Sequence, residues 1–279
     1  MKSMHVSIKK SLEKLQTDYI DLFYVHWWDL TTGVEEVMHG LNSLITAGKV
    51  LYLGISDTPA WVVVKANDYA RANGLRPFSV YQGKWNASFR DMEREIIPMC
   101  RDQGMGIAPW AALGQGRFKG AAAREAAHTG AGRAAQLSEN EVRVSDALEA
   151  VANRKNTSLH AVVSRSTRKP EVTLRNNTMT DTIQALAYVL QKTPYVFPII
   201  GQRKVDHLLA NIEALKIELT PEDLDQIDSA IPFDAGFPNN FLIDGKYNPN
   251  VTSSDLWSVK LAGHLDSVEH QRAIRPHKE

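Results

Sequence analysis

Residues 17–29, TDYIDLFYVHWWD, decide the fold of this chain. The continuous apolar run from Tyr19 to Val25 is typical of a buried β-strand. That strand would deliver His26, Trp27 and Trp28 to its carboxyl end. Functional residues of α/β proteins gather at this end of parallel strands, so the stretch indicates a site as well as a fold.

The segments around this strand alternate between helix and strand patterns. Amphipathic spacing predicts a helix over residues 3–15 ahead of it. The helices expected after it cover residues 34–47, 59–74, 92–102, 141–154 and 205–214, and the further strands cover residues 50–55, 78–81, 106–109 and 195–200. Five βα units with continuously apolar strands predict a parallel sheet with both faces covered. An open doubly wound sheet would give the same alternation, but its glycine-rich fingerprint after the first strand is missing here.

The composition excludes several classes of function. Lysine plus arginine equals aspartate plus glutamate at 32 each, so no net field would draw the chain to nucleic acid. The sequence has neither a signal-peptide core nor a run of about 18 apolar residues. Cys100 is the single cysteine, which rules out an intrachain disulfide and suits a reducing compartment. We expect a soluble cytoplasmic protein without a nucleic-acid or membrane partner; its oligomeric state is not readable from the sequence.

Two further stretches belong with the opening one: GISDTPAW, residues 54–61, and SVYQGKWN, residues 79–86. Together the three resemble the aldo-keto reductases, in particular the branch of fungal aryl-alcohol dehydrogenases and norsolorinic acid reductases. The resemblance implies an α/β fold, a (β/α)8 TIM barrel, in which the first strand of this chain is the fourth of eight. We therefore expect a partial barrel, N-terminally truncated, with about five of eight βα units. It would form a single incomplete domain over residues 1–279 with a C-terminal tail at residues 232–279.

Carbonyl reduction needs a hydride source, a proton donor and groups that polarise the carbonyl oxygen. The resemblance implies NADP(H) as the hydride source and an Asp, a Tyr proton donor, a Lys and a His as the catalytic set. Of these four, only the histidine has a match, His26, which would orient the substrate. Tyr24 lies about 6.5 Å deeper along the strand, where it would miss a substrate at the mouth, and Lys84 is not the family's lysine. We expect a small carbonyl or alcohol substrate for the intact oxidoreductase of fungal secondary metabolism, and impaired or absent turnover by the printed chain.

These residues also have plain structural interpretations. His26 could be a histidine whose hydrogen bonds are satisfied by neighbours at a strand end. Trp27 and Trp28 could pack against the fold instead of lining a substrate pocket. The alternative function for the chain is a non-catalytic NADP-binding remnant or pseudoenzyme, supported by the missing Asp, Tyr and Lys.

The residues that the resemblance assigns to the cofactor are better preserved. Ser56 and Asp57 at one strand end and Gln82 at the next would hold the nicotinamide carboxamide, which needs both donors and acceptors. Trp110 would stack on the nicotinamide ring. Ser56 and Asp57 also suit a helix cap ahead of Pro59, and the two roles can coexist.

Two more segments complete the cofactor site that the resemblance implies. Residues 111–118, AALGQGRF, look like the loop around the pyrophosphate, where small residues let backbone amides approach the anion. The residues assigned to this loop are Ala111, Leu113, Gly114, Gly116 and Arg117. The residues assigned to the adenosine end are Gly201, Gln202, Arg203, Lys204, His207 and Asn211.

The adenosine segment favours NADP over NAD, because Arg203 or Lys204 could face a 2′-phosphate. A basic, solvated helix start is the structural alternative, although basic residues there oppose the helix dipole unless an anion is present. Ala210 departs from the family, which usually has a Glu or Gln at that place.

Residues 163–184 interrupt what would otherwise be one helix, running from residues 158–162 into residues 185–190. Pro170 and the pair Asn176-Asn177 disfavour helix, so we expect a surface loop or disorder. Our hypothesis is a retained intron, because a Val codon can begin with GT and a Gln codon can end in AG. A genuine surface insertion is the alternative.

Overall fold

The computed structural model of the chain describes residues 2–121, 124–125, 137–163, 177–201, 205–243, 247, 250–263, 266, 268 and 271–276. Of residues 156–163, 177–182, 206 and 210 it describes the backbone alone. The chain divides into two compact units. The first holds Met1–Lys84 and Asp91–Ala108, and the second holds Trp85–Arg90 and Pro109–Glu279.

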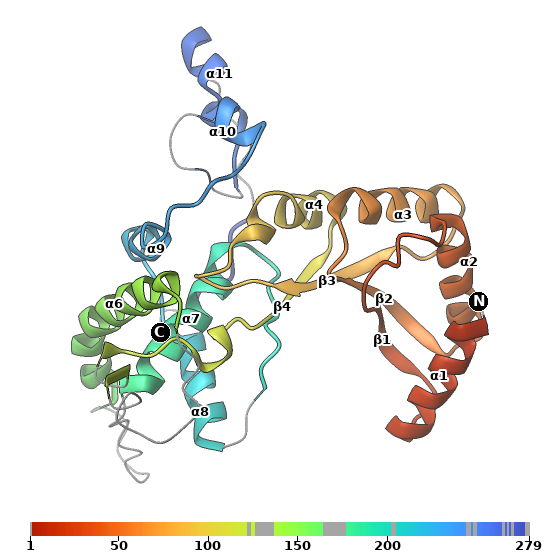
Figure 1. Cartoon of the computed structure of the whole chain (residues 1–279), viewed down its shortest axis with the longest axis horizontal. Coiled ribbons are helices and arrows are strands. Elements are labelled where there is room, and N and C mark those ends of the chain that lie inside the picture. The colour runs from red at the N-terminus through yellow and green to blue at the C-terminus, as the bar shows by residue number, and fades with distance from the viewer. Residues whose placement is uncertain are drawn as a thin grey trace. The chain divides into compact units, whose positions relative to one another are not determined.

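Parallel strands and the helices between them form the first unit (Figure 1). Its elements are α1 (Lys2–Leu15), β1 (Ile20–Val25), α2 (Val34–Thr46), β2 (Val50–Ser56), α3 (Ala60–Ala72), β3 (Phe78–Lys84), η1 (Asp91–Glu93), α4 (Ile96–Gln103) and β4 (Gly106–Trp110), whose last two residues belong to the second unit. The strands lie in the order β1-β2-β3-β4, and β2 pairs in parallel with both β1 and β3. The predicted α/β fold with a parallel sheet is confirmed.

The helices of the first unit form one layer beside the strands (Figure 1). α2 packs on β2 and on α3, and α3 packs on β3 and on α4. Strands that follow one another in sequence order, joined by right-handed crossovers, place their helices on the same face. A doubly wound sheet instead reverses its strand order at a switch point, and the order β1-β2-β3-β4 has no reversal. The four strands therefore form part of a barrel wall.

The core of the first unit is built from the apolar side chains of α2, β2 and α3. Leu41, Leu53, Ile55 and Val63 are each at most 1% exposed. Burying a side chain of this kind contributes about 1.5–3 kcal/mol. Cys100 on α4 is also fully buried, and burial raises the pKa of its thiol to about 12.

The sheet of the first unit is not covered on both faces. Leu51 and Tyr52 of β2 are 43% and 56% exposed, and no residue of β1 is fully buried. The expectation of two covered faces is wrong for the described strands. A barrel wall has helices on its outer side only, because the inner side is filled by side chains of strands across the barrel.

The second unit is mostly helical among its described residues. Its elements are η2 (Gly114–Gly116), α6 (Glu139–Val163), α7 (Asn177–Lys192), α8 (Val205–Glu213), η3 (Ala214–Lys216), α9 (Pro221–Asp228), α10 (Asn239–Leu242), η4 (Ser253–Asp255) and α11 (Trp257–Ala262). α6 packs on α7 and α9, and α7 packs on α8 and η3. Val144, Leu148, Tyr188 and Leu219 have no exposed surface and form the core of this unit.

The strand predicted over residues 195–200 is not formed, so the structure describes four strands where five were expected. Val196 is a bridge residue, and a backbone hydrogen bond from Ile199 N to Pro109 O at 2.9 Å joins this segment to the end of β4. The two prolines explain the difference, because neither Pro198 nor Pro109 has an N–H to continue a ladder. Tyr195 and Phe197 remain 49% and 60% exposed.

The helix predicted over residues 92–102 is divided into η1 and α4. Pro98 is the third residue of α4, a position in the first turn where its missing N–H costs little. In one continuous helix from residue 92 the proline would be internal and would clash with the preceding turn. The boundary at Ile96 follows from this proline.

The insert at residues 163–184 begins at the end of α6 and ends inside α7. Residues 164–176 lie outside the described part, so the predicted loop or disorder is not tested there. Residues 177–184 are helical, and the loop prediction is wrong for them. Ile183 and Gln184 are 6% and 0% exposed. Burial of the end of this segment gives helix formation a stability that local propensity lacks.

Candidate functional site

Three neighbouring strands of the first unit end side by side. Val25 at the end of β1 pairs with Ile55, and Ser56 at the end of β2 pairs with Gln82 on β3. His26 therefore follows a strand end next to those that carry Ser56 and Gln82. The structure brings the predicted nicotinamide residues of this unit to one edge of the sheet.

The turn after β2 presents Ser56 and Asp57 in a fixed arrangement. Ser56 Oγ donates to Asp57 Oδ2 at 3.1 Å, and Asp57 N donates to the backbone oxygen of Gln82 at 3.1 Å. Asp57 has a left-handed backbone, with φ of 43°. Ser56 is 2% exposed, whereas Asp57 is exposed. The alternative role as a helix cap is wrong, because Pro59 is the N-cap of α3 and no side chain caps it.

A buried tyrosine holds this turn against β3. The Tyr81 hydroxyl donates to Thr58 O at 2.8 Å and accepts from Thr58 N at 3.0 Å. Thr58 Oγ1 donates to Ser56 O at 2.8 Å. Burial raises the pKa of Tyr81 far above its ordinary value, so the hydroxyl keeps its proton and acts as a structural clamp. Sequence reasoning missed this pair, because Tyr81 and Thr58 meet only through strand pairing.

The ring of Tyr24 lies against the backbone of Gly54 on β2. Its backbone pairs with Gly54, two residues below the strand end. Burial raises the pKa of its hydroxyl, and the interaction with the Gln82 side chain opposes this rise. The expectation that Tyr24 would miss a substrate at the mouth stays a prediction.

His26 lies on the surface at the end of β1. Its ring stacks on Trp27 with a centroid distance of 4.3 Å and an interplanar angle of 33°. Trp27 is 62% exposed, so a pure packing role does not describe it. An exposed imidazole beside an exposed indole can meet an incoming aromatic molecule.

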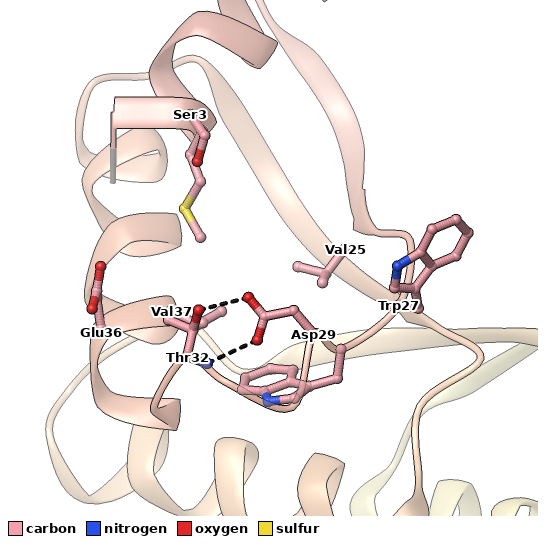
Figure 2. Close-up of a pocket in the computed structure, with 9 residues that line it drawn as sticks. Ser3, Val25, Trp27, Asp29, Thr32, Glu36 and Val37 are labelled. Atoms are coloured by element: carbon pink, nitrogen blue, oxygen red, sulfur yellow. Dashed lines mark hydrogen bonds between the residues drawn. The ribbon is translucent and has the colours of Figure 1, made fainter.

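A surface hollow of about 220 Å³ lies beside this strand end. Figure 2 shows Val25, Trp27, Asp29 and Thr32 around it, with Ser3 of α1 and Glu36 and Val37 of α2 on its other side. Both tryptophans of the opening stretch line the hollow, whereas His26 is outside its lining.

Asp29 fixes the loop that forms the floor of this hollow. Its Oδ1 accepts from the backbone N–H of Thr31 at 2.9 Å. Two bonds from Thr32 join it (Figure 2): Oδ1 accepts from the backbone N–H at 2.8 Å and Oδ2 accepts from Oγ1 at 2.6 Å. The hydrogen bonds from Thr32, followed by that from Thr31, lower the pKa of Asp29 to about 2. Sequence reasoning did not single out this residue, although Asp followed by Thr at the second and third positions is a known turn signal.

In the second unit, the predicted pyrophosphate loop follows Trp110 and is tightly wound. Ala111, Gly114, Gln115 and Gly116 all have left-handed backbones, with φ between 55° and 77°. A Cβ on Gly114 would lie 2.8 Å from the ring of Phe118, so this glycine is required. The N–H groups of Gly114 and Gly116 donate within the loop, to Ala111 O at 2.8 Å and Leu113 O at 3.3 Å.

Arg117 ties this loop to the first turn of α6. Its Nη1 donates to both carboxylate oxygens of Glu141, at 3.0 and 3.1 Å. Glu141 also accepts from Ser138 N at 2.8 Å. Burial opposes ionisation of Glu141, but the bonds from Ser138 and Arg117 outweigh it and lower its pKa. The predicted anion ligand Arg117 thus has a carboxylate partner in this structure.

The residues predicted for the adenosine end are described only in part. Gln202, Arg203 and Lys204 lie outside the described residues. Gly201 and His207 are exposed. Asn211 on α8 is 5% exposed, and its Nδ2 has no hydrogen-bond partner among the described residues. A buried amide without a partner costs about 1–3 kcal/mol, so a polar ligand such as an adenine ring suits this position.

A tyrosine, a lysine and an aspartate do meet in the second unit, but not as a catalytic set. Tyr188 donates to Asp228 Oδ1 at 2.6 Å, and Lys192 forms an ion pair with Asp228 Oδ2. Arg90 Nη1 lies 3.5 Å from Asp228 Oδ1 and donates to its backbone oxygen at 3.2 Å. Tyr188 has no exposed surface. Substrate cannot reach its hydroxyl, so the cluster joins α7, α9 and residue 90 structurally.

Two features are absent from the described residues. No group of three or more His, Cys, Asp or Glu side chains there is arranged to hold a metal ion. None of the described helices has the length and hydropathy needed to cross a bilayer.

A wall of parallel strands with polar side chains at the strand ends is the arrangement found in the TIM-barrel class. The aldo/keto reductase family model matches residues 1–232, so the chain belongs to the aldo/keto reductase family. The family resemblance seen in the sequence is confirmed.

Three similar proteins indicate the branch and the fold. Norsolorinic acid reductase A of Aspergillus parasiticus is 50% identical over 278 residues, which cover 99% of this chain and 65% of that protein. The chain thus spans less than two thirds of that relative's length. An aryl-alcohol dehydrogenase (NADP+) of Phanerodontia chrysosporium is 47% identical over 287 residues, covering 100% of this chain and 67% of that protein. A thermostable aldo-keto reductase crystallised with the inhibitor epalrestat shares the fold, with a TM-score of 0.60 and 23% identity over 82% of this chain and 66% of that one.

Proposed function

We propose that the protein is an NADP(H)-dependent carbonyl or alcohol oxidoreductase of fungal secondary metabolism. The cluster of Ser56, Asp57 and Gln82 at neighbouring strand ends carries this proposal. Family membership supports it, as do similar proteins named norsolorinic acid reductase and aryl-alcohol dehydrogenase (NADP+). Both names describe chemistry at a carbonyl or alcohol group.

The side chains of the first unit suit a nicotinamide carboxamide. That group offers two N–H donors and one oxygen acceptor, and a serine hydroxyl and a glutamine amide can satisfy both kinds. When bound, NADPH supplies the hydride that reduces the substrate carbonyl carbon. His26 would orient the carbonyl oxygen, which takes up a proton as the alcohol forms.

In the second unit we propose roles for the loop after β4 and for α8. Trp110 would offer its indole face to the nicotinamide ring, and the wound loop at residues 111–117 would bind the pyrophosphate. Arg203 or Lys204 would bind the 2′-phosphate that distinguishes NADP from NAD. The Nδ2 of Asn211, which has no hydrogen-bond partner among the described residues, supports an adenine contact at α8.

A second candidate function is NADP binding without catalysis by the 279 residues as printed. It is favoured because His26 is the one member of the family's catalytic set with a match in the sequence. A tyrosine, a lysine and an aspartate do meet in the cluster around Asp228, but Tyr188 and Lys192 are buried. We propose that this chain by itself turns over slowly or not at all.

Titration calorimetry with NADPH and NADH tests the cofactor proposal. We expect NADPH to bind more tightly than NADH, and Gln82→Leu to weaken NADPH binding. Gln103→Leu on α4, which bonds Arg71 on the surface, is the matched control and should leave binding unchanged. A folded chain that ignores NADPH would refute the proposal.

The second step is an assay with NADPH and a panel of aromatic aldehydes, followed by absorbance at the nicotinamide band. Cofactor binding without turnover supports the non-catalytic candidate. Turnover that His26→Ala abolishes supports the oxidoreductase and contradicts the non-catalytic candidate.

A further inference from the structure

The loop after β4, to which the proposed function gives the pyrophosphate, is bonded to itself in this structure. Three of its backbone N–H groups donate inside the loop. Gly114 N donates to Ala111 O at 2.8 Å, and Gly116 N donates to Leu113 O at 3.3 Å. Arg117 N donates to Gly114 O at 3.0 Å. An anion that approaches this loop therefore finds these N–H groups already bonded.

The side chain of Arg117 is engaged as well, but only at one edge. Its Nη1 donates to both carboxylate oxygens of Glu141, at 3.0 and 3.1 Å. A guanidinium has five N–H groups, and Nη1 carries two of them. The other three have no protein partner among the described residues, and the side chain is 42% exposed. An anion can thus approach Arg117 from the edge that Glu141 leaves open.

Glu141 is held in place by the first turn of α6. Its Oε2 accepts from Ser138 N at 2.8 Å and from Ser138 Oγ at 3.1 Å, and its own N–H donates to Ser138 Oγ at 3.2 Å. This is the reciprocal bonding of a capping box. Burial opposes ionisation of Glu141, but the bonds from Ser138 and Arg117 lower its pKa. A fixed negative charge of α6 therefore lies against Arg117.

The charge of Glu141 opposes the binding of a second anion at Arg117. A phosphate oxygen is bound most strongly by a cation that has no other anionic partner. Paired with Glu141, Arg117 adds no net charge to the loop. The carboxylate and a pyrophosphate would compete for the same guanidinium.

We propose that Glu141 is an internal anion that competes with the dinucleotide pyrophosphate for Arg117 and so limits the affinity of the loop for the cofactor. The inference rests on the proposed cofactor function and adds to it a residue that opposes binding. The exchange begins at the open edge of the guanidinium. It ends with the Glu141 carboxylate bonded to Ser138 alone, because the bonds within the cap do not involve Arg117.

Calorimetric titration of the full chain with NADPH tests this competition. Glu141→Gln removes the charge and keeps the shape of the side chain. NADPH should then bind about twofold to tenfold more tightly, the range for releasing one partly exposed ion pair. The same variant should unfold at a lower urea concentration, because the cap of α6 is weaker. A merely structural role of Glu141 would lower stability without raising affinity.

Two controls isolate the contact with Arg117. Glu139→Gln removes the same charge from the same helix turn, at an exposed residue that pairs with Arg143. It should leave NADPH affinity unchanged, which would exclude a general effect of lost negative charge. Adenosine 2′-monophosphate is the part of NADPH that lacks the pyrophosphate, and Glu141→Gln should not change its affinity.

A double variant measures the coupling between the two residues. Arg117→Leu alone should weaken NADPH binding, because the cation that binds the pyrophosphate is gone. In this background Glu141→Gln should no longer tighten NADPH binding, since the contact that it releases is absent.

Every other outcome contradicts the competition. Weaker NADPH binding by Glu141→Gln would mean that Glu141 holds Arg117 ready for the ligand. Equal tightening by Glu139→Gln, tightening that persists with Arg117→Leu, or Arg117→Leu equal to wild type would also overturn it. Wild-type chain that binds NADPH, with Glu141→Gln unchanged in affinity, overturns this inference alone. Folded wild-type and variant chains that all ignore NADPH refute the proposed function itself.

Discussion

In the first unit Ser56 and Gln82 are placed by strand pairing, whereas in the second unit Asp223 and Asp228 are placed by ion pairs between segments far apart in sequence. Strand pairing depends on the backbone and tolerates side-chain changes. An ion pair inside a protein depends on both partners, and removing one leaves the other charge buried. We therefore expect the two units to respond differently to single substitutions.

The largest effect is expected at Asp228. Asp228→Ala would leave Lys192 and Arg90 buried without their carboxylate, and breaking a buried pair in this way costs about 3–5 kcal/mol. Urea unfolding followed by circular dichroism measures the change. Glu213→Ala, which removes an exposed pair with Lys216 in the same unit, should cost less than about 1 kcal/mol. Equal effects of the two variants would contradict the contrast between the units.

The next effect is expected at Asp223 and depends on pH. Burial opposes ionisation of Asp223, but bonds from Lys155, Arg154 and Thr220 outweigh it and lower its pKa from 3.8 to about 2. A lowered folded-state pKa gives stability that is complete above pH 3.8 and is lost as the pH falls toward 2. The contribution near pH 7 is about 2 kcal/mol.

Asp223→Asn should therefore lower the free energy of unfolding by about 2 kcal/mol at neutral pH and by little near pH 2. Asp225→Asn, at an exposed position of the same helix, provides the control. Unfolding curves at several pH values measure the difference between variant and wild type. A difference that does not shrink as the pH falls would show that the ion pairs are not its source.

A smaller effect is expected at Gly54 in the first unit. The added methyl of Gly54→Ala would press on the Tyr24 ring at 2.5 Å, and overpacking of this kind costs about 1–2 kcal/mol. At Gly33 the new Cβ would meet only the movable Glu35 carboxylate, at 3.2 Å, so Gly33→Ala is the comparison. In thermal unfolding, Gly54→Ala should have a lower melting temperature than Gly33→Ala. If both variants have the same melting temperature as wild type, the result would contradict the close approach of the Tyr24 ring to Gly54.

The smallest effect is expected at the cap of α6. Glu141→Gln keeps the shape of the side chain but weakens its bonds to Ser138 and Arg117. A lost capping interaction costs about 1 kcal/mol. Glu139→Gln, which affects only an exposed pair with Arg143, should cost less than about 0.5 kcal/mol. Chemical unfolding at low and high salt would check both, and a larger loss at residue 139 would contradict the assignment.

The sequence predicts most of the first unit, because its signals are local. Apolar runs mark β1, β2 and β3, and their parallel pairing then places Ser56 and Gln82 together without further information. The position of the Tyr24 ring could not be predicted, since it depends on the register that sets Tyr24 opposite Gly54. Pro98, by contrast, is a local sequence signal for the start of α4.

The second unit is less predictable because its contacts join distant residues. Nothing in the spacing of Tyr188 and Asp228, 40 residues apart, indicates a hydrogen bond. The missing strand at residues 195–200 shows the limit of apolar pattern alone, since Pro198 has no N–H to donate to a ladder. For the adenosine end, Gln202, Arg203 and Lys204 lie outside the described residues, and their assignment stays a prediction.

The burial of Cys100 on α4 has a practical consequence. Alkylating reagents attack the thiolate, and a thiol with a pKa of about 12 and no exposed surface offers almost none at neutral pH. Because the chain has a single cysteine, maleimide labelling would report on one place only. The rate of maleimide labelling would then report the rate at which α4 opens. No other residue would have to be mutated for this measurement.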